Sequence, residues 1–373
     1  MMTSREPENA LILRIIGWSA VIVLCVIAFF GSVLFKSTPP ERGAVEMLLA
    51  DNEKGFANVE RGYEIRFPDD YGLHENYRQE WWYVTANLKD SEGNEYGVQW
   101  TVFRSAVSPK KGEAWNNQHI YMAHAVLTTK DVTYKSERFA RGGIGQAGVS
   151  SSPFSVWIDD WQWSSSSESP FPATLMGGEQ DFYFNLDMQL TQPEVLQGEK
   201  GFSQKHATQN VASYYFSVPA VELSGTLNID GKSVAVEGKG WIDREWSTKA
   251  LSDDQKGWDW FALQFDDGGS LMMVQVRSEN GPYRFGSITS AAGETQRLES
   301  DEIEMTPVSF TKVSSGRYVP THWQLKLKNY DLSIETTPLN EQNWLPFAFP
   351  YWEGPVDVSG SKQGAGFMEA TGY

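Results

Sequence analysis

Hydrophobic and polar residues alternate along most of the chain after residue 60, in short runs that glycine-containing turns separate. Alternation with a period of two residues is typical of half-buried strands, and turn residues between two such runs indicate a hairpin. Three segments show this pattern clearly: residues 80–105, 221–238 and 259–290. The second segment turns at Asp230 and Gly231, a pair that suits a turn with positive φ. We therefore expect antiparallel β-structure in this part of the chain.

No segment beyond residue 35 has an apolar period of 3.6 residues over three turns, so the pattern predicts an all-β fold. Many short strands with regular turns favour barrels or sandwiches. A faint internal repeat also points to two similar domains, because Trp82–Arg104 and Trp258–Arg277 both read as an aromatic run, a turn and a strand that ends in arginine. We expect one barrel over residues 61–248 and a second over residues 249–373.

The N-terminal part has a different pattern, since residues 15–35 form an uncharged run of 21 residues. As a helix, this run would span roughly 30 Å, about the thickness of a bilayer's hydrocarbon core. A cleaved signal peptide is the alternative, but its apolar region is usually shorter and a small-residue cleavage site follows it. We predict a retained transmembrane anchor after a short cytoplasmic tail of residues 1–14, and a linker over residues 36–60.

The charged residues indicate how the chain is oriented in the membrane and argue against nucleic acid as a partner. The 373-residue chain has a formal net charge of −17, which repels nucleic acid phosphates, so no nucleic acid partner is expected. Arg5 and Arg14 precede the predicted anchor, and Lys36 and Arg42 follow it. We expect a single-pass protein of the cell (inner) membrane. Its N-terminus would lie in the cytoplasm, and the bulk of the chain would lie outside the cytoplasm, in the periplasm.

Several kinds of site find no support in the sequence. The single cysteine, Cys25, cannot form an intrachain disulfide, and the five histidines are scattered. His119 and His124 are five residues apart and would point to opposite faces of a strand, so no metal site is expected. The chain has no G-x-S-x-G motif and no glycine-rich phosphate loop, so we expect neither a serine hydrolase nor a cofactor.

The segment GWIDREWS, residues 240–247, holds the strongest candidate chemistry. In a strand, Asp243 and Glu245 share one face with Trp241, while Arg244 and Trp246 share the other. If the first face lines an apolar cavity, burial and mutual repulsion raise the pKa of at least one acid, which then serves as a proton donor. The alternative is an ordinary strand with a salt bridge, and composition alone favours it.

Other aromatic strands supply candidate pocket walls, in a chain with 15 tryptophans. In residues 79–84, Glu80 and Trp82 face one way and Trp81 and Tyr83 the other. Such runs also suit a plain barrel core. Our candidate ligand-binding residues are Trp241, Trp246, Glu80, Trp82, Tyr83, His124, Tyr215, Trp258 and Trp260. For the polar partner of a buried acid at 243 or 245, the candidates are Tyr83, His124 and Arg104.

Five segments in order resemble the AttH-like family, which includes proteins labelled predicted secreted hydrolases and, more distantly, the carotenoid 1,2-hydratases. They read EWWYVTANL, KGFSQKHATQNVASYYFSVP, GKGWIDREWS, GWDWFALQFDDGGSLMMVQVR and YWEGPVDVSGSKQGAGFMEATGY. The resemblance covers roughly residues 60–373. It implies two lipocalin-like antiparallel β-barrel domains, in agreement with the strand pattern.

The resemblance also implies a function. The hydratases add water to a carotenoid double bond without a cofactor, using an acid and aromatic faces, and Asp243, Glu245, Trp241 and Trp246 resemble those parts. The present chain is more similar to the anchored branch of the family. We therefore expect a protein that binds or hands on a lipid or isoprenoid-like apolar ligand. The alternative is a hydratase-like or hydrolase-like enzyme with Asp243 and Glu245 as catalytic acids. The sequence identifies no protein partner.

Overall fold

The computed structural model describes residues 53–373. The predicted tail, the predicted anchor and the first part of the predicted linker lie outside these residues. Within the described range, no helix has both the length and the apolar character needed to cross a membrane. Helical structure in this range consists of two three-residue 3-10 turns, η1 (Asp69–Tyr71) and η2 (Ala114–Asn116). The all-β prediction is therefore confirmed for the described chain.

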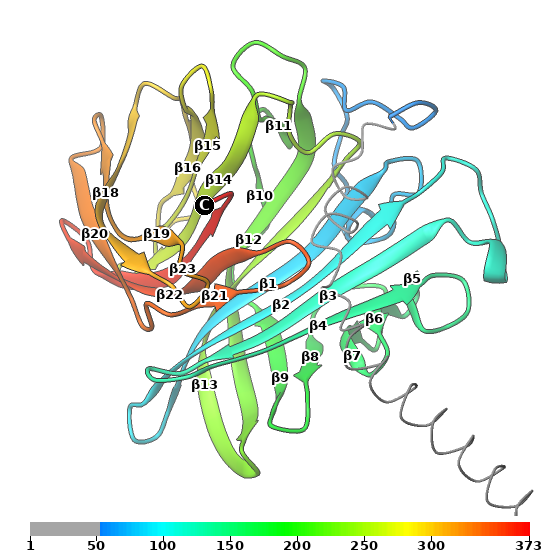
Figure 1. The fold of residues 1–373 in the computed structure, drawn as a ribbon, viewed down its shortest axis with the longest axis horizontal. Coiled ribbons are helices and arrows are strands. Elements are labelled where there is room, and N and C mark those ends of the chain that lie inside the picture. The colour runs from blue at the N-terminus through cyan, green and yellow to red at the C-terminus, as the bar shows by residue number, and fades with distance from the viewer. Residues whose placement is uncertain (1–52) are drawn as a thin grey trace, which may run out of the picture. The chain divides into compact units, whose positions relative to one another are not determined.

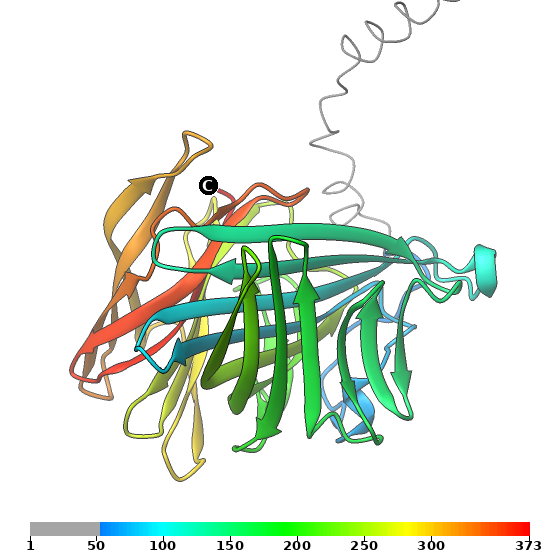
Figure 2. The ribbon, with the colours of Figure 1, turned by 90° about the horizontal axis from the view of Figure 1, so that it is seen from below.

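The first sheet is antiparallel throughout and curls into a nearly closed barrel (Figures 1 and 2). Its main path runs in the order β4-β3-β2-β1-β13-β12-β9-β8-β7-β6-β5, and β10 and β11 pair with β12. The strands are β1 (Gln79–Asp90), β2 (Glu95–Ala106), β3 (His119–Thr128), β4 (Thr133–Arg141), β5 (Ala147–Ser151), β6 (Phe154–Ile158), β7 (Trp161–Ser165), β8 (Ala173–Gly178), β9 (Phe182–Leu190), β10 (Val195–Leu196), β11 (Phe202–Gln204), β12 (Ala212–Ile229) and β13 (Lys232–Ser247).

The second sheet is also antiparallel but forms a half-barrel instead of the second barrel that we expected (Figure 1). Its order is β17-β16-β15-β14-β23-β22-β20-β19-β18, and β21 pairs with β22. The strands are β14 (Gln255–Phe265), β15 (Ser270–Ser278), β16 (Tyr283–Thr289), β17 (Thr295–Leu298), β18 (Ile303–Lys312), β19 (Tyr318–Leu327), β20 (Leu332–Pro338), β21 (Trp344–Leu345), β22 (Tyr351–Gly360) and β23 (Gly364–Thr371).

The hairpins expected from the sequence are present. Residues 80–105 form β1 and β2, residues 221–238 belong to β12 and β13, and residues 259–290 form β14, β15 and β16. Asp230 and Gly231 both have positive φ at the turn between β12 and β13. Asparagine, aspartate and glycine tolerate this conformation better than other residues, so the local sequence determines this turn.

Aromatic side chains fill the interior of the first barrel. Trp82, Trp100, Trp161, Trp163 and Trp246 have no exposed surface and belong to one continuous core. The second sheet buries a separate core around Trp323 and Trp352. A small barrel whose interior is packed in this way has no lumen left for a ligand of any size.

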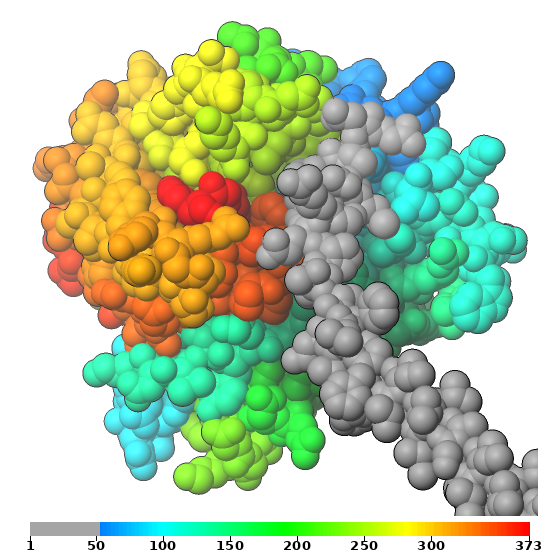
Figure 3. Space-filling model, viewed as in Figure 1, coloured from blue at the N-terminus to red at the C-terminus, as the bar shows by residue number. Residues whose placement is uncertain are grey.

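The two sheets pack against each other through a third cluster, which includes Tyr83 and Tyr215 from the first sheet and Trp260 and Phe367 from the second. Gln264 of β14 also donates a hydrogen bond to the carbonyl of Gly240 in β13. Strands β1, β12 and β13 are therefore covered on both faces, by the barrel core on one side and by the second sheet on the other. On the face shown in Figure 3, the C-terminal residues lie between other segments of the second sheet.

Candidate functional site

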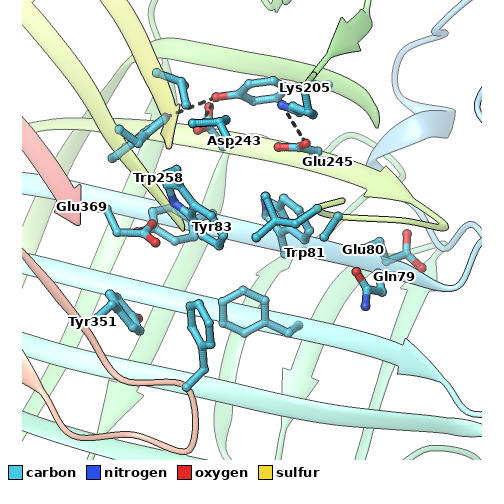
Figure 4. A pocket seen from close by; sticks show the side chains of 18 of the residues that line it. Gln79, Glu80, Trp81, Tyr83, Lys205, Asp243, Glu245, Trp258, Tyr351 and Glu369 are labelled. Atoms are coloured by element: carbon cyan, nitrogen blue, oxygen red, sulfur yellow. Dashed lines mark hydrogen bonds and ion pairs between the residues drawn. The ribbon is translucent and has the colours of Figure 1, made fainter. Parts of the chain in front are cut away.

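A pocket of about 170 Å³ lies between the two sheets, outside the packed interior of the first barrel (Figure 4). Both sheets contribute aromatic side chains to its wall: Trp81, Tyr83, Phe103, Tyr215, Trp258 and Trp260. Four acidic residues also line it: Glu80, Asp243, Glu245 and Glu369. The pocket therefore combines flat apolar surfaces with acidic groups that are largely removed from water.

Strand alternation in β13 places Asp243 and Glu245 on the face that looks toward the second sheet. Asp243 lies opposite Tyr83 of β1 and Ser217 of β12, and Glu245 lies opposite Trp81 and Tyr215. Side chains directly opposite each other on antiparallel strands share a face. The same face of the sheet therefore carries both acids and three of the aromatic wall residues.

Asp243 is only 5% exposed and accepts three hydrogen bonds. The hydroxyls of Tyr215 and Ser217 each donate to it at 2.6 Å, and the indole N–H of Trp241 donates at 2.8 Å. Burial raises the pKa of Asp243 to about 6, although the three donors oppose that shift. A carboxyl with this pKa changes its protonation state within the physiological pH range.

Glu245 has a different partner, because the ammonium of Lys205 lies 2.9 Å from its carboxylate. Lys205 follows β11, and its Nζ also lies 4.6 Å from the ring centre of Tyr215 and 4.7 Å from that of Phe285. The two acids of β13 thus lie in different environments, since Asp243 has neutral donors and Glu245 has a cation.

A second carboxyl pair comes from the other sheet. Glu353 of β22 and Glu369 of β23 lie directly opposite each other, and the hydroxyl of Tyr83 hydrogen-bonds to both. Burial raises the pKa of Glu369 to about 7, and burial together with the charge of Glu369 raises the pKa of Glu353 well above its usual range. Two opposed carboxylates repel each other, so the pair keeps a proton near neutral pH.

His124 does not reach the pocket wall but contacts a residue that does. Its Nδ1 lies 2.7 Å from the hydroxyl of Tyr351, which lines the pocket and also accepts a hydrogen bond from Gln99. Its Nε2 lies 3.2 Å from Glu137. Burial lowers the pKa of His124, which favours the neutral ring. His124 therefore orients Tyr351 rather than binding a ligand directly.

The structure brings together most of the residues that the sequence predicted for the site, but not all of them. Trp82 and Trp246 point into the barrel core, where the Arg244 guanidinium lies 3.9 Å from the ring centre of Trp82. Trp82 is one residue from Tyr83 in β1, and Trp246 is three residues from Asp243 in β13. Residues an odd number of positions apart in a strand point to opposite faces of the sheet. Trp241 is not in the pocket wall, and its role is the hydrogen bond to Asp243.

Glu80 borders the pocket, but its carboxylate is part of an ion-pair network. It pairs with Arg104 and Arg244, and all three side chains have no exposed surface. The charges of the two arginines keep the pKa of Glu80 well below its usual range despite its burial. Glu80 is therefore held as a structural anion rather than as a group that is free to meet a ligand.

The partners that the sequence suggested for a buried acid at 243 or 245 are wrong, because the observed partners are Tyr215, Ser217 and Trp241 for Asp243 and Lys205 for Glu245. Tyr83 binds the two glutamates of the second sheet, His124 binds Tyr351, and Arg104 binds Glu80. For Arg104 the cause is again the choice of face, because it lies on the barrel side of β2. Tyr83 and His124 lie on the same face as Asp243, but their partners come from β22 and β23 of the second sheet.

Sequence reasoning missed Lys205, Glu353 and Glu369 as site residues. The two glutamates carried a usable signal, since each is an isolated acid inside an apolar strand, in YWEGPV and GFMEAT. Lys205 carried none, because it lies just beyond a short strand and reaches the pocket only through the tertiary fold. Within residues 53–373, no group of three or more histidine, cysteine or acidic side chains is arranged to hold a metal ion.

Comparison with known proteins agrees with this architecture. A family model described as AttH-like matches residues 58–373. The crystal structure of a candidate AttH protein from Nitrosomonas europaea is 30% identical, with a TM-score of 0.78 over 85% of this chain and 99% of that one.

Two more distant structures share the fold. Kievitone hydratase from Nectria haematococca is 16% identical, with a TM-score of 0.63 over 85% of this chain and 96% of its own. CghA, solved with Sch210972, is 12% identical, with a TM-score of 0.52 over 88% of this chain and 97% of its own. No curated protein matches the chain.

Proposed function

Since this chain belongs to the AttH-like family, we propose that it is a cofactor-free enzyme that acts on an apolar molecule in the pocket between its two sheets. The proposed reaction adds water to a carbon–carbon double bond or, in reverse, removes it. The observation that carries this proposal is the presence of two kinds of buried carboxyl group around one aromatic pocket. Titratable groups with different environments at one site are the usual basis of acid–base catalysis.

The Glu353–Glu369 pair is suited to be the proton donor. The pair keeps a proton near neutral pH because both carboxyls are buried and opposed. Asp243 is suited to be the acceptor, since three neutral donors stabilise its ionised form and its pKa is about 6. Its charge also raises the pKa of both glutamates, which indicates that the groups are near one another.

Hydration would use these groups in two steps. In the first, the O–H bond of the Glu369 carboxyl breaks and its proton forms a C–H bond with one alkene carbon, leaving positive charge on the other carbon. The carboxylates and the ring faces of the pocket stabilise that charge. In the second step, a water oxygen bonds to the cationic carbon and its proton passes to Asp243. Solvent exchange then returns the proton to the glutamate pair.

Fold-level similarity supports the reaction class as an analogy. Kievitone hydratase has the same fold at low sequence identity, so this type of scaffold is known to carry a hydratase. A shared fold alone does not determine function, and the proposal therefore depends on the carboxyl groups of this chain.

Isotope labelling tests the proposal on many candidate substrates at once. The full chain is incubated with a panel of isoprenoid and aryl alkenes and alcohols in water enriched in ¹⁸O, and products are examined by mass spectrometry. We expect ¹⁸O incorporation in at least one compound, and a loss of at least about a hundredfold in rate for Asp243→Asn and for Glu369→Gln. Glu237→Gln, a change at an exposed acid on the same strand as Asp243, is the control.

Binding of an apolar ligand without chemistry is the second candidate, and the aromatic wall of the pocket favours it. In this case the chain binds or hands on a lipid or isoprenoid-like molecule. Native mass spectrometry of protein extracted in mild detergent would then show a retained ligand. No panel compound would gain ¹⁸O, and Asp243→Asn would change the amount of retained ligand only modestly.

A further inference from the structure

The charges around the pocket are unbalanced. Three buried carboxyl groups on the face between the sheets line it, those of Asp243, Glu245 and Glu369, and Glu353 lies directly opposite Glu369 on the neighbouring strand. The cation paired with this group in the described chain is Lys205, which binds Glu245. Glu80 and Arg104 also border the pocket, but they pair with each other, and Glu80 pairs with Arg244 as well, so this network contributes no unpaired negative charge to the pocket.

Lys205 shows how a cation is held in this pocket. Its ammonium lies against one carboxylate, at 2.9 Å from Glu245, and near the rings of Tyr215 and Phe285 at 4.6 and 4.7 Å. A carboxylate combined with ring faces is the usual environment for a bound organic ammonium. One side of the pocket is thus already a cation cage, occupied by a side chain of the protein itself.

The other side of the pocket has the same components without a cation in the described residues. Trp81, Trp258 and Trp260 supply ring faces, and Asp243 and Glu369 supply carboxyl groups. All hydrogen-bond donors to Asp243 are neutral, as are those to the glutamate pair.

One buried oxygen of this acidic group also lacks a partner. Oε2 of Glu353 makes no hydrogen bond, and the residue is 1% exposed. The other oxygen of this carboxyl accepts the hydrogen bond from Tyr83, and the residue lies opposite Glu369. A buried polar oxygen without a partner is costly, and an approaching positive charge would relieve that cost.

We propose that the pocket binds an organic cation, an ammonium group with small apolar substituents, against Asp243 and Glu369. The pocket volume of about 170 Å³ leaves room for roughly ten water-sized groups, which is enough for a quaternary ammonium with small substituents. This inference rests on the proposed function only in taking the same pocket as the ligand-binding site. It concerns equilibrium binding of a cation and requires no reaction.

A matched pair of probes tests the inference on the full chain in mild detergent. Choline and its neutral isostere 3,3-dimethylbutan-1-ol have nearly the same shape and differ in charge. By isothermal titration calorimetry at pH 8, we expect choline to bind about tenfold or more tightly than the alcohol. Its affinity should fall from pH 8 to pH 5 as the carboxyls take up protons, while that of the alcohol should stay constant.

Variants locate the effect. Asp243→Asn and Glu369→Gln should each weaken choline binding, and Glu237→Gln should leave it unchanged because that acid is exposed outside the pocket. Lys205→Met should strengthen choline binding, because the substitution removes the ammonium that lies against Glu245, Tyr215 and Phe285 and leaves these groups available to a bound cation. If the wild-type chain binds the two probes with equal affinity, or binds neither, the inference is overturned without any result from the variants. The ¹⁸O experiment is independent of these outcomes, so the reaction and the cation site can fail separately.

Discussion

Glu353 and Glu369 lie opposite each other on β22 and β23, and one hydroxyl from the other sheet, that of Tyr83, hydrogen-bonds to both. This relationship links the two sheets through a buried pair of acids. Like charges opposite each other on a sheet are destabilising unless one is neutralised. The pair therefore remains in place because burial keeps a proton on it and because Tyr83 supplies a shared donor.

Removing that donor should change both stability and ionisation. Tyr83→Phe is expected to cost about 1–3 kcal/mol of unfolding free energy, since it leaves two buried acceptors without their partner. The hydrogen bond lowers the pKa of both glutamates, so their pKa values should rise further in the variant. Urea denaturation and ¹³C NMR of labelled glutamate carboxyls measure the two effects. Tyr96→Phe, which removes a hydrogen bond near the surface, should change neither glutamate signal.

The stability that Asp243, Glu353 and Glu369 contribute should decrease as pH rises from about 5 to about 8. Their pKa values are raised in the folded state, so these three groups bind more protons in the folded than in the unfolded protein in this range. Their contribution is fully present below the unfolded pKa and is lost as pH rises through the folded value. Urea midpoints at several pH values test this, and Asp243→Asn should flatten the slope. A steeper slope in that variant would contradict the assignment.

Acid should destabilise the protein through other groups. Asp70, Glu80 and Asp254 have lowered pKa values in the folded state, and that of Asp254 is about 2. Stability from these groups is present above their unfolded pKa and is lost as pH falls through the folded value. The urea midpoint should therefore also fall below about pH 4.

Glu80 should matter for folding rather than for ligand choice. Glu80→Gln leaves the buried guanidinium groups of Arg104 and Arg244 without their anion, and breaking a buried ion pair costs about 3–5 kcal/mol. Glu95→Gln, which removes an exposed partner of Lys89, should cost at most about 1 kcal/mol. Urea denaturation compares the two variants. A small loss for Glu80→Gln would contradict the structural role assigned to this network.

The pH–rate profile of any compound that gains ¹⁸O should be bell-shaped. Activity needs an ionised Asp243, whose pKa is about 6, and a protonated Glu369, whose pKa is about 7. The optimum should therefore lie between these values. Asp243→Asn should remove the acidic limb and leave a low residual rate. A profile that stays flat from pH 5 to pH 8 would argue against proton transfer by these groups.

We further propose that residues 15–35 stay attached as a membrane anchor and that residues 36–373 lie outside the cytoplasm. The physical reason is the uncharged run of 21 residues without a small-residue cleavage site. N-terminal sequencing of the mature protein should begin before residue 15, and a start after residue 30 would contradict the anchor. An engineered surface cysteine, for example at Ser361, should react with a thiol reagent that cannot cross the membrane.

Much of the architecture follows from local pattern. Alternating runs and glycine-containing turns predicted an all-β chain, because strand periodicity and positive-φ turn positions depend on neighbouring residues only. The same reasoning placed Asp243 and Glu245 on one face of a strand, and Arg244 and Trp246 on the other. The register of β13 with β1 and β12 agrees with that separation.

The tertiary structure decided which of those faces meets a cavity. Both faces of β13 are buried near its end, so burial and aromatic content could not distinguish the barrel core from the pocket. Trp82 and Trp246 therefore looked like pocket residues although they pack inside the barrel. Glu353 and Glu369 join the site across more than a hundred residues of chain, and Lys205 reaches it from a loop. Such contacts depend on how two sheets pack, and no local period in the sequence encodes that packing.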